Sequence, residues 1–280
     1  MTVRKRVDAS ALRTELLAPA GPYAAIDVVP STGSTNADLR AAAVAGAADY
    51  TVLLAEEQTS GAGRRGRGWV SPRGSGVYCS VLLRPAGVAF ADLGSLAVVA
   101  GLAITDVTAA LDVDAVLKWP NDVLAGPDRG KCAGVLAESV ASDETAVVLG
   151  IGLNVQPLGT DVPPGPGGLP ATSLVEAGAR SVDRTEVAAL LLAALADRER
   201  SWRDARGDLA AAGQLADYRA RCATLGQQVK VVLADGAAQL GTAVDVDASG
   251  QLVLESVEGV RRTVLAGDVI HLRAPDREYG

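Results

Sequence analysis

Aromatic and sulfur-containing residues are scarce in this 280-residue chain, which has one phenylalanine, one methionine and only 3% aromatic residues. Its core must therefore be built mainly from leucine, valine and alanine, and such residues favour tight packing of helices on a sheet. Hydrophobic residues nevertheless make up 49% of the chain. This length and composition are sufficient for one large domain with a core and one small domain.

Paired cysteines and an excess of basic residues are also lacking. The three cysteines, Cys79, Cys132 and Cys222, lie far apart in the sequence, which argues against a disulfide framework or a zinc site and fits a reducing cytosol. The formal net charge is -7. A protein this acidic is a poor general binder of nucleic acid, because neutralising phosphates requires a basic face.

Targeting and membrane signals are missing from the sequence. The first ten residues contain basic side chains, but no apolar stretch follows them, so a secretory signal is not expected. The apolar stretch Leu93–Leu111 is interrupted by Asp106 and by several glycines and threonines, and we interpret it as a long buried helix rather than a membrane span. We therefore predict a soluble, cytoplasmic protein with no membrane partner.

The pattern of apolar residues predicts two regions with different secondary structure. Before residue 225, helices alternate with strands; the helices are predicted at Ser10–Leu17 with Ser10 as cap, Asn36–Gly46, Leu93–Leu111, Thr185–Arg206 and Leu209–Cys222. The strands of this region are predicted at Ile26–Val29, Thr51–Ala55, Val77–Leu83, Val113–Lys118, Lys131–Glu138 and Ala146–Val155. The stretch Asp161–Pro170 is rich in proline and glycine and is predicted to be a flexible surface loop.

After Gly226 five short strands follow within about fifty residues, at Gln228–Leu233, Ala238–Val244, Gln251–Glu255, Arg261–Leu265 and Val269–Arg273. The sequence thus predicts an α+β domain over residues 1–224 and a small all-β barrel over residues 225–280.

The most distinctive segment is Gly61-Ala-Gly-Arg-Arg-Gly-Arg-Gly-Trp69. Five arginines and no acidic residue occur between Gln58 and Ala91, so this part of an acidic protein is locally positive. The glycines leave backbone N–H groups open to an anion, and arginine donates in pairs to carboxylate or phosphate. The segment is not a Walker loop, because its glycines and the terminal Lys-Ser/Thr do not fit; residues 61–66 match Gly-x-Gly-x-x-Gly loosely, but no helix pattern follows as the dinucleotide-binding motif requires. A solvated basic loop or a nucleic-acid-binding arm remains an alternative on composition alone.

Four further segments combine polar residues with tight turns. Lys118-Trp-Pro-Asn-Asp122 could hold phosphate and Mg²⁺ or could be an ordinary turn. Gly134 in the segment Lys131–Glu138 permits close backbone approach, although a lysine at a strand edge is usually just solvated. The alternate glycines of Gly150–Asn154 weaken a buried strand unless something must lie against it. Ser31–Asn36 either caps a helix or binds a small polar group.

In this order, the five segments resemble the catalytic domain of biotin–protein ligases, the biotin–[acetyl-CoA-carboxylase] ligase family. The resemblance runs from about residue 26 to the C-terminus. It implies a mixed-sheet α+β domain of the biotin/lipoate ligase type, followed by a small SH3-like C-terminal domain. It also implies a carbon–nitrogen ligase that uses ATP and Mg²⁺ to make biotinyl-5'-AMP. The biotin would then pass to a specific lysine of a biotin carboxyl carrier protein or domain of an acyl-CoA carboxylase.

The resemblance assigns roles to residues of this chain. The residues it implies for biotin are Ser34, Thr35, Asn36, Gln58, Gly61, Ala62, Gly63, Arg64, Lys131 and Gly134. Those it implies for ATP and the adenylate are Arg67, Trp69, Lys118, Asn121, Asp122, Gly152 and Asn154. The catalytic residues would be Lys131, Arg64 and Asp122, with Asp122 also a ligand for Mg²⁺.

The sequence departs from the family pattern in two places. Many members have Gly-Arg-Gly where this chain has Gly61-Ala62-Gly63, so Ala62 can offer only its backbone N–H. Some relatives stack a tryptophan on adenine near the segment that is Ala171–Leu174 here, and this segment has no aromatic residue. About thirty residues precede Ser31, too few for the helix-turn-helix domain of the repressor members, so we expect no DNA binding.

Two rival interpretations remain. A lipoate–protein ligase shares the fold and the chemistry, but the Gly/Arg segment and the Lys-Trp-Pro-Asn-Asp turn resemble the biotin branch. A nucleic-acid-binding module would use the arginines, but the charge of -7 and the scarcity of aromatic residues for base stacking argue against it.

Overall fold

A seven-stranded sheet forms the centre of the larger part of the protein. The computed structural model of the chain describes residues 4–140, 145–159, 162–180, 182–233, 236–265 and 267–272. The strand order is β1-β2-β3-β7-β6-β5-β4. The pair β1–β2 is parallel and the other pairs are antiparallel, so the sheet is mixed. The strands are β1 (Ala25–Val29), β2 (Thr51–Ala55), β3 (Gly76–Leu83), β4 (Ala115–Lys118), β5 (Asp122–Ala125), β6 (Gly130–Val140) and β7 (Ala146–Asn154).

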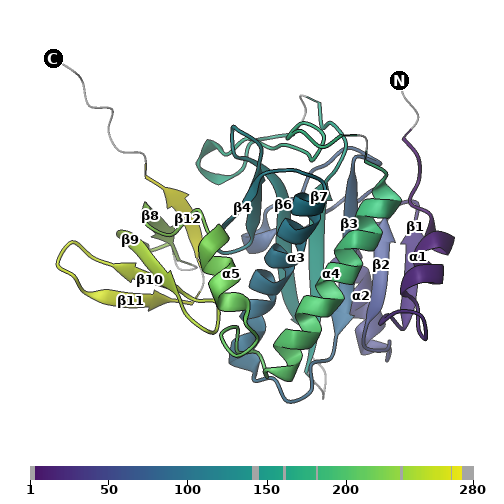
Figure 1. Cartoon of the computed structure of the whole chain (residues 1–280), viewed down its shortest axis with the longest axis horizontal. Coiled ribbons are helices and arrows are strands. Elements are labelled where there is room, and N and C mark those ends of the chain that lie inside the picture. Colours follow the sequence, from purple (N-terminus) through teal and green to yellow (C-terminus); the bar gives the residue numbers. More distant parts are fainter. Residues whose placement is uncertain are drawn as a thin grey trace.

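Helices cover both faces of this sheet, because its strands are apolar on both sides. One face carries α3 (Leu96–Ala110), α4 (Arg184–Asp204) and α1 (Ala9–Leu16), and the other carries α2 (Thr35–Val44) (Figure 1). Successive residues of β7 show the alternation of a strand: Val147 and Leu149 belong to the main core, whereas Val148 packs with Leu39 of α2. Even-numbered residues of β7 therefore face α2.

The helix α3 is apolar on almost every side, because it packs against the sheet, α4 and α5 (Gln214–Arg221). Together with the 3-10 helix η2 (Phe90–Ser95), it forms the stretch Phe90–Ala110, the one helical stretch of the described residues long and apolar enough to cross a membrane. However, 72% of its most apolar window is buried inside the protein. The predicted long buried helix is confirmed, and it is a core helix of the sheet domain.

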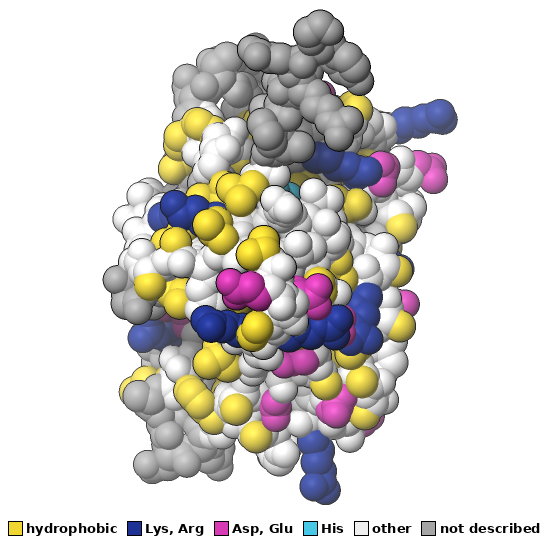
Figure 2. All heavy atoms as spheres, turned by 90° about the vertical axis from the view of Figure 1, so that its left-hand side faces the viewer, with side chains coloured by type: hydrophobic (Ala, Val, Ile, Leu, Met, Phe, Trp, Pro, Cys, Tyr) yellow, Lys and Arg dark blue, Asp and Glu magenta, His cyan; other side chains and the backbone are white. Residues whose placement is uncertain are grey.

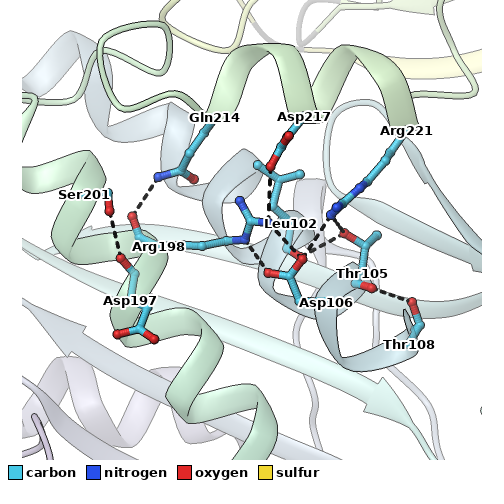
Figure 3. Close-up of polar contacts among 10 residues, drawn as sticks. All are labelled: Leu102, Thr105, Asp106, Thr108, Asp197, Arg198, Ser201, Gln214, Asp217 and Arg221. Carbon is cyan, nitrogen blue, oxygen red and sulfur yellow. Dashed lines mark hydrogen bonds and ion pairs between the residues drawn. The ribbon is translucent and has the colours of Figure 1, made fainter. Parts of the chain in front are cut away.

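A charged cluster joins α3 and α4 to α5 (Gln214–Arg221). Asp106, the charged residue of α3, accepts hydrogen bonds from Arg198 of α4 (2.8 Å from Nη2) and Arg221 of α5 (3.0 Å from Nη1) (Figure 3). Arg198 also lies 3.5 Å from Asp217. Because these carboxylates and guanidiniums satisfy one another, the charge that interrupts the apolar helix is accommodated at its surface.

The C-terminal strands form a second, antiparallel sheet of order β11-β10-β9-β8-β12, beside α5 and β4 (Figure 1). The strands are β8 (Gln228–Val232), β9 (Ala238–Val246), β10 (Leu252–Glu255), β11 (Arg261–Val264) and β12 (Asp268–His271). Their buried residues belong to the same hydrophobic cluster as the large domain. Between the two parts, Trp119 Nε1 donates to Gly250 O (2.9 Å). The predicted α+β fold with a small all-β C-terminal part is confirmed, whereas the boundary between residues 224 and 225 stays a prediction.

Several predicted elements differ from the structure in their ends. Asp8, not Ser10, caps α1, because its carboxylate accepts from the N–H groups of Ser10 and Ala11. Strand β5 was not predicted, since the turn Trp119-Pro120-Asn121 is so tight that the chain reverses at once. The helix predicted from Leu209 begins only at Gln214, after Gly213 in the left-handed region (φ 72°). Within the proline-rich stretch, Pro166–Gly168 form a 3-10 helix (η3), and Asp161 and Arg273 lie outside the described residues.

Candidate active site

The candidate site lies on the α2 face of the sheet, at the N-terminal end of that helix. Ser34 caps α2 through a bond from Ala37 N to its Oγ (3.5 Å), so residues 34–36 form the first turn. Side chains on a strand alternate between faces, so Gly134 of β6 and Gly150 and Gly152 of β7 are on this face too. Sequence segments more than one hundred residues apart are thereby brought together.

A first pocket is formed by these residues, with about 440 Å³ of empty space that includes part open to solvent. Ten residues that the resemblance implied line it: Ser34, Thr35, Asn36, Gln58, Ala62, Gly63, Trp69, Asn121, Gly134 and Gly152. It is also lined by Cys79, Val135, Leu136, Gly150 and Ile151. The lining is polar at the α2 end and apolar along the strands, and it holds no ionised side chain.

The polar end of this pocket is a hydrogen-bonded network. Gln58 Oε1 accepts from Thr35 N (2.9 Å) and Thr35 Oγ1 (3.1 Å), which directs its amide Nε2 toward the Gly61 side. Ser80 donates to Thr35 Oγ1 (2.7 Å) and lies within hydrogen-bond distance of Asn36 Oδ1 (2.6 Å). Asn36 Nδ2 donates to Glu138 Oε2 (2.8 Å). Much of the hydrogen-bonding capacity of Asn36 is thus used inside the protein, so Asn36 acts as a framework for the pocket.

Two glycines of β7 allow side chains to lie flat on the sheet. A Cβ at Gly150 would be 2.1 Å from Asn36 Oδ1, and one at Gly152 would be 2.6 Å from the Trp69 ring. Trp69 also covers Gly134. The prediction that something must lie against the alternate glycines is confirmed: that something is Asn36 and Trp69. The Trp69 Nε1 is buried and has no hydrogen-bond partner among the described residues, so it can donate to a ligand.

A second, larger pocket adjoins the first at Trp69, which lines both. It has about 1010 Å³ of empty space, including open solvent. Of the residues implied by the resemblance, Arg67, Trp69, Lys131 and Asn154 line it; the others are Gly68, Val70, Val162, Pro163, Pro164, Gly165, Leu169 and Ala171. This pocket therefore combines two cations with a wall of prolines and aliphatic side chains.

Lys131 lines the second pocket and lies beside Gly134 of the first, since its Nζ would be 3.3 Å from a Cβ at Gly134. Its Nζ is 2.6 Å from Asp122 Oδ1 and 5.4 Å from the centre of the Trp69 ring, and its side chain is 22% exposed. Lys131 is therefore not simply a solvated lysine at a strand edge. The Asp122 carboxylate and the face of the Trp69 ring hold the Lys131 ammonium in place. An ammonium fixed in this position can bind an anionic group of a ligand that extends from one pocket into the other.

Lys118 and Asn121 make mainly internal contacts. Lys118 is 9% exposed and donates to Val269 O (2.8 Å). Burial lowers the pKa of its ammonium, and the nearby Asp122 carboxylate opposes this. The Asn121 amide donates to Val135 O (2.6 Å), while Val135 N donates to Asn121 O (3.0 Å). These bonds fix the turn between β4 and β5, and neither Lys118 nor Asp122 lines either pocket.

The Gly/Arg segment folds back on itself rather than remaining open. Gly63 N donates to Arg67 O (2.7 Å) and Trp69 N to Gly61 O (2.8 Å), so these two N–H groups are not free for an anion as the nest prediction requires. The turn at η1 (Arg64–Gly66) has Arg65 at φ 58° and Gly66 at φ 72°. Arg64, predicted to touch biotin, instead donates to Gly267 O (3.1 Å).

Four residues of the site were missed at the level of sequence. Cys79 lines the first pocket, and burial raises the pKa of its thiol to about 12, so it is a wall and not a nucleophile. Ser80 and Glu138 position residues 35 and 36, and Asp268 binds two arginines. The alternation of side chains along a strand places Ser80 and Glu138 on the face of the sheet that carries α2, so the sequence pattern could have identified them. No pattern in the sequence indicates the role of Asp268.

Comparison with known proteins agrees with this geometry. The family model described as the biotin/lipoate A/B protein ligase family matches residues 27–154, and that of the biotin protein ligase C terminal domain matches residues 224–272. Over 276 residues the chain is 43% identical to the biotin–[acetyl-CoA-carboxylase] ligase of Mycobacterium tuberculosis, covering 97% of this chain and 98% of that protein. The chain therefore belongs to the biotin/lipoate protein ligase family, in its biotin protein ligase branch.

Two further relatives agree. The chain is similar to the biotin–[acetyl-CoA-carboxylase] ligase of Paracoccus denitrificans, at 35% identity over 85% of this chain and 97% of that protein. Its fold is similar to the biotin protein ligase from Aquifex aeolicus solved with biotin and ATP, with a TM-score of 0.73 and 26% identity, covering 90% of this chain and 100% of that one.

Proposed function

We propose that this chain is a biotin–protein ligase that forms biotinyl-5'-AMP from biotin and ATP and transfers the biotin to a lysine of a biotin carboxyl carrier protein. The observation that carries the proposal is the pair of adjoining pockets with Trp69 between them and Lys131 at their junction. One pocket is small and polar but uncharged, and the other is larger, cationic and partly apolar. The small uncharged pocket suits a neutral polar ring such as that of biotin, and the larger cationic pocket suits a nucleotide.

In the first half-reaction the biotin carboxylate attacks the α-phosphorus of ATP, and pyrophosphate leaves. Two anions must approach each other, so positive charge at the meeting point lowers the barrier. Lys131 lies at the junction, and Arg67 lines the nucleotide pocket. In the second half-reaction the acceptor amine attacks the acyl carbon of the adenylate, an amide forms, AMP leaves, and the amine proton passes to a base. Asp122, beside Lys131, is our candidate for that base.

Magnesium enters as part of the MgATP substrate. Among the residues that the structure describes, no group of three or more histidine, cysteine or acidic side chains could hold a metal ion. Oxygen ligands are what Mg²⁺ prefers, and phosphates can supply most of them. Asp122 Oδ1 is already bound to Lys131, so Asp122 can add one further carboxylate oxygen at most.

The polar network of the first pocket favours biotin over lipoate. The biotin ureido group has N–H donors and a carbonyl acceptor, whereas the lipoyl dithiolane ring has neither. The Ser34 hydroxyl and the Gln58 amide line this pocket. If the dithiolane ring were bound there, these groups would lose water and gain no hydrogen-bond partner from the ligand, which disfavours lipoate.

The contacts of the arginines also disfavour a nucleic-acid arm. Arg64, Arg65 and Arg67 bind groups of the C-terminal domain, so they are not arrayed toward a polymer. Figure 2 shows acidic, basic and apolar side chains interspersed over the face that the C-terminal domain presents. A polyanion requires a continuous basic face. We therefore propose a protein acceptor rather than DNA as the macromolecular partner.

The test of this proposal is transfer to a defined acceptor. The protein is incubated with MgATP, biotin and a purified biotin carboxyl carrier domain, and the mass of the acceptor is measured. An increase equal to one biotinyl group, lost when the acceptor lysine is replaced by arginine, is the expected result. An acceptor that remains unmodified while a known ligase modifies it would contradict the proposal.

A further inference from the structure

Four basic residues, of which Arg67 lines the nucleotide pocket, contact three consecutive residues of the C-terminal domain at the start of β12. Asp268 binds Arg65 (Oδ2 to Nη1, 3.0 Å) and Arg67 (Oδ1 to Nη2, 2.8 Å). Gly267 O accepts from Arg64 Nη1 (3.1 Å), and Val269 O accepts from Lys118 Nζ (2.8 Å). A short strand of one domain thus contacts four basic residues of the other.

Arg67 connects these contacts to the pocket. Its guanidinium binds Asp268, its Nε donates to Arg64 O (3.1 Å), and the residue lines the nucleotide pocket. The place of this side chain in the pocket therefore depends on the carboxylate of Asp268. Arg65 lines neither pocket, but it donates to Val232 O (3.2 Å) and Leu233 O (3.0 Å) of the C-terminal domain, which adds two bonds to the same attachment.

Charge explains why a carboxylate is needed here. Three arginines and Lys118 converge on the segment 267–269 and repel one another. Burial lowers the pKa of the Arg64 guanidinium, the Asp268 carboxylate opposes that shift, and Arg67 and Arg65 add to it. Exposed ion pairs contribute little, but the Asp268 side chain is only 17% exposed and accepts from two guanidiniums at once, the kind of bond that is about twice as strong as a neutral one.

We propose that Asp268 is a positioning residue for the nucleotide half of the site, holding the Gly/Arg segment 61–69 closed against the C-terminal domain with Arg67 placed for the ATP phosphates. The inference rests on the proposed function for its identification of the ligand as ATP. The contacts of Asp268 involve neither Ser34 nor Gln58, so the biotin pocket is independent of it.

The test compares Asp268→Asn with Glu255→Gln in the full chain. Glu255 is a matched control, because it is a carboxylate of the same domain whose ion pair, with Arg261 (2.8 Å), is local. We expect Asp268→Asn to raise the KM for ATP about tenfold, as for the loss of charge-assisted bonds. The kcat and the biotin affinity measured by calorimetry should both stay within about twofold of the Glu255→Gln values. A KM for ATP that is unchanged or lowered would overturn the proposal.

A second measurement does not depend on activity. Trypsin cleaves after arginine, so the rate of cleavage after Arg64 and Arg67, which every variant below retains, reports how firmly the segment is held. It should rise in Asp268→Asn and in Arg65→Gln, with little further increase in the double variant, since both changes break the same attachment. If Asp268→Asn is cleaved no faster than Glu255→Gln, Asp268 does not hold the segment against the C-terminal domain, whichever nucleotide the protein uses. A wild-type protein that makes no adenylate would instead count against the proposed function.

Discussion

At the scale of single residues, the site depends on side chains whose positions are fixed by their neighbours. Lys131 is held between Asp122 and the Trp69 ring, and Asn36 is held between Ser80 and Glu138. Preorganised polar groups act in a transition state without the cost of reorientation. Two substitutions test these two arrangements separately.

Replacing Lys131 by alanine should slow formation of the adenylate by about 10²–10³-fold, as for the loss of one preorganised donor. The lysine is at the second position of β6 and is partly exposed, so the fold should survive. Pyrophosphate release in a single turnover is the measurement. Lys5→Ala is the control, since Lys5 forms an exposed pair with Asp183. Near-normal release from Lys131→Ala would remove this lysine from the mechanism.

Replacing Gly150 by alanine should damage the biotin pocket from within the sheet. The added Cβ would lie 2.1 Å from Asn36 Oδ1, so the buried network must move, at a cost of about 1–3 kcal/mol in the free energy of unfolding. Biotin affinity should fall as well. Gly94→Ala is the control, because a Cβ there meets nothing within 4 Å. Equal thermal stability and equal biotin affinity in the two variants would show that Asn36 is not constrained as we describe.

At the scale of elements, the sequence predicts most strands and helices but not their tight junctions. Periodicity marks long buried segments such as α3 and β7 well. It failed at β5, where a four-residue strand follows a proline turn without a connecting stretch, and at the start of α5, where Leu209 is buried outside a helix. The glycines of β7 predicted a close neighbour, but which side chain lies on each depends on pairings across the sheet.

The contacts of the Gly/Arg segment also could not be predicted from the sequence pattern. Its composition predicts an anion site, yet its arginines bind a domain that begins more than 150 residues later. We expect this segment to be in equilibrium between attached and released forms, and ligand to favour the attached form. Biotin with ATP should therefore slow trypsin cleavage after its arginines at least severalfold. Equal cleavage with and without both ligands would count against this expectation.

The cluster at Asp106 makes a prediction about pH. Burial would raise the pKa of this carboxyl, but hydrogen bonds and charges from Arg198 and Arg221 more than offset it, so the net pKa is lowered (Figure 3). A lowered pKa contributes stability above the unfolded value near 3.9 that is lost as pH falls through the folded value.

Asp106→Asn should consequently cost about 1 kcal/mol at pH 7, since a third of the side chain is exposed and solvent screens the pairs. The difference from the wild type should shrink below about pH 4. Urea unfolding at a series of pH values measures it, and a difference that is the same at pH 7 and pH 3 would show that the carboxylate charge is not responsible.

At the scale of the whole molecule, the two parts of the chain share one hydrophobic core and polar contacts from Trp119, Lys118 and Thr224 to the C-terminal domain. We therefore expect them to unfold together, because neither buries its apolar surface without the other. Scanning calorimetry should show one transition whose van't Hoff enthalpy equals the calorimetric one. Two resolved transitions would show that the C-terminal domain is an independent unit.

We expect the two adjoining pockets to hold a small carboxylic acid beside ATP, so that an acyl-adenylate forms, and we expect the acid to be biotin. The most direct measurement is incubation of the protein with MgATP and equal amounts of biotin and lipoate, followed by detection of acyl-adenylates by mass. We expect biotinyl-5'-AMP in large excess, because the polar end of the first pocket can form hydrogen bonds with a ureido ring and not with a dithiolane ring. Lipoyl-adenylate in equal or greater amount, or no adenylate from either acid, would contradict this expectation.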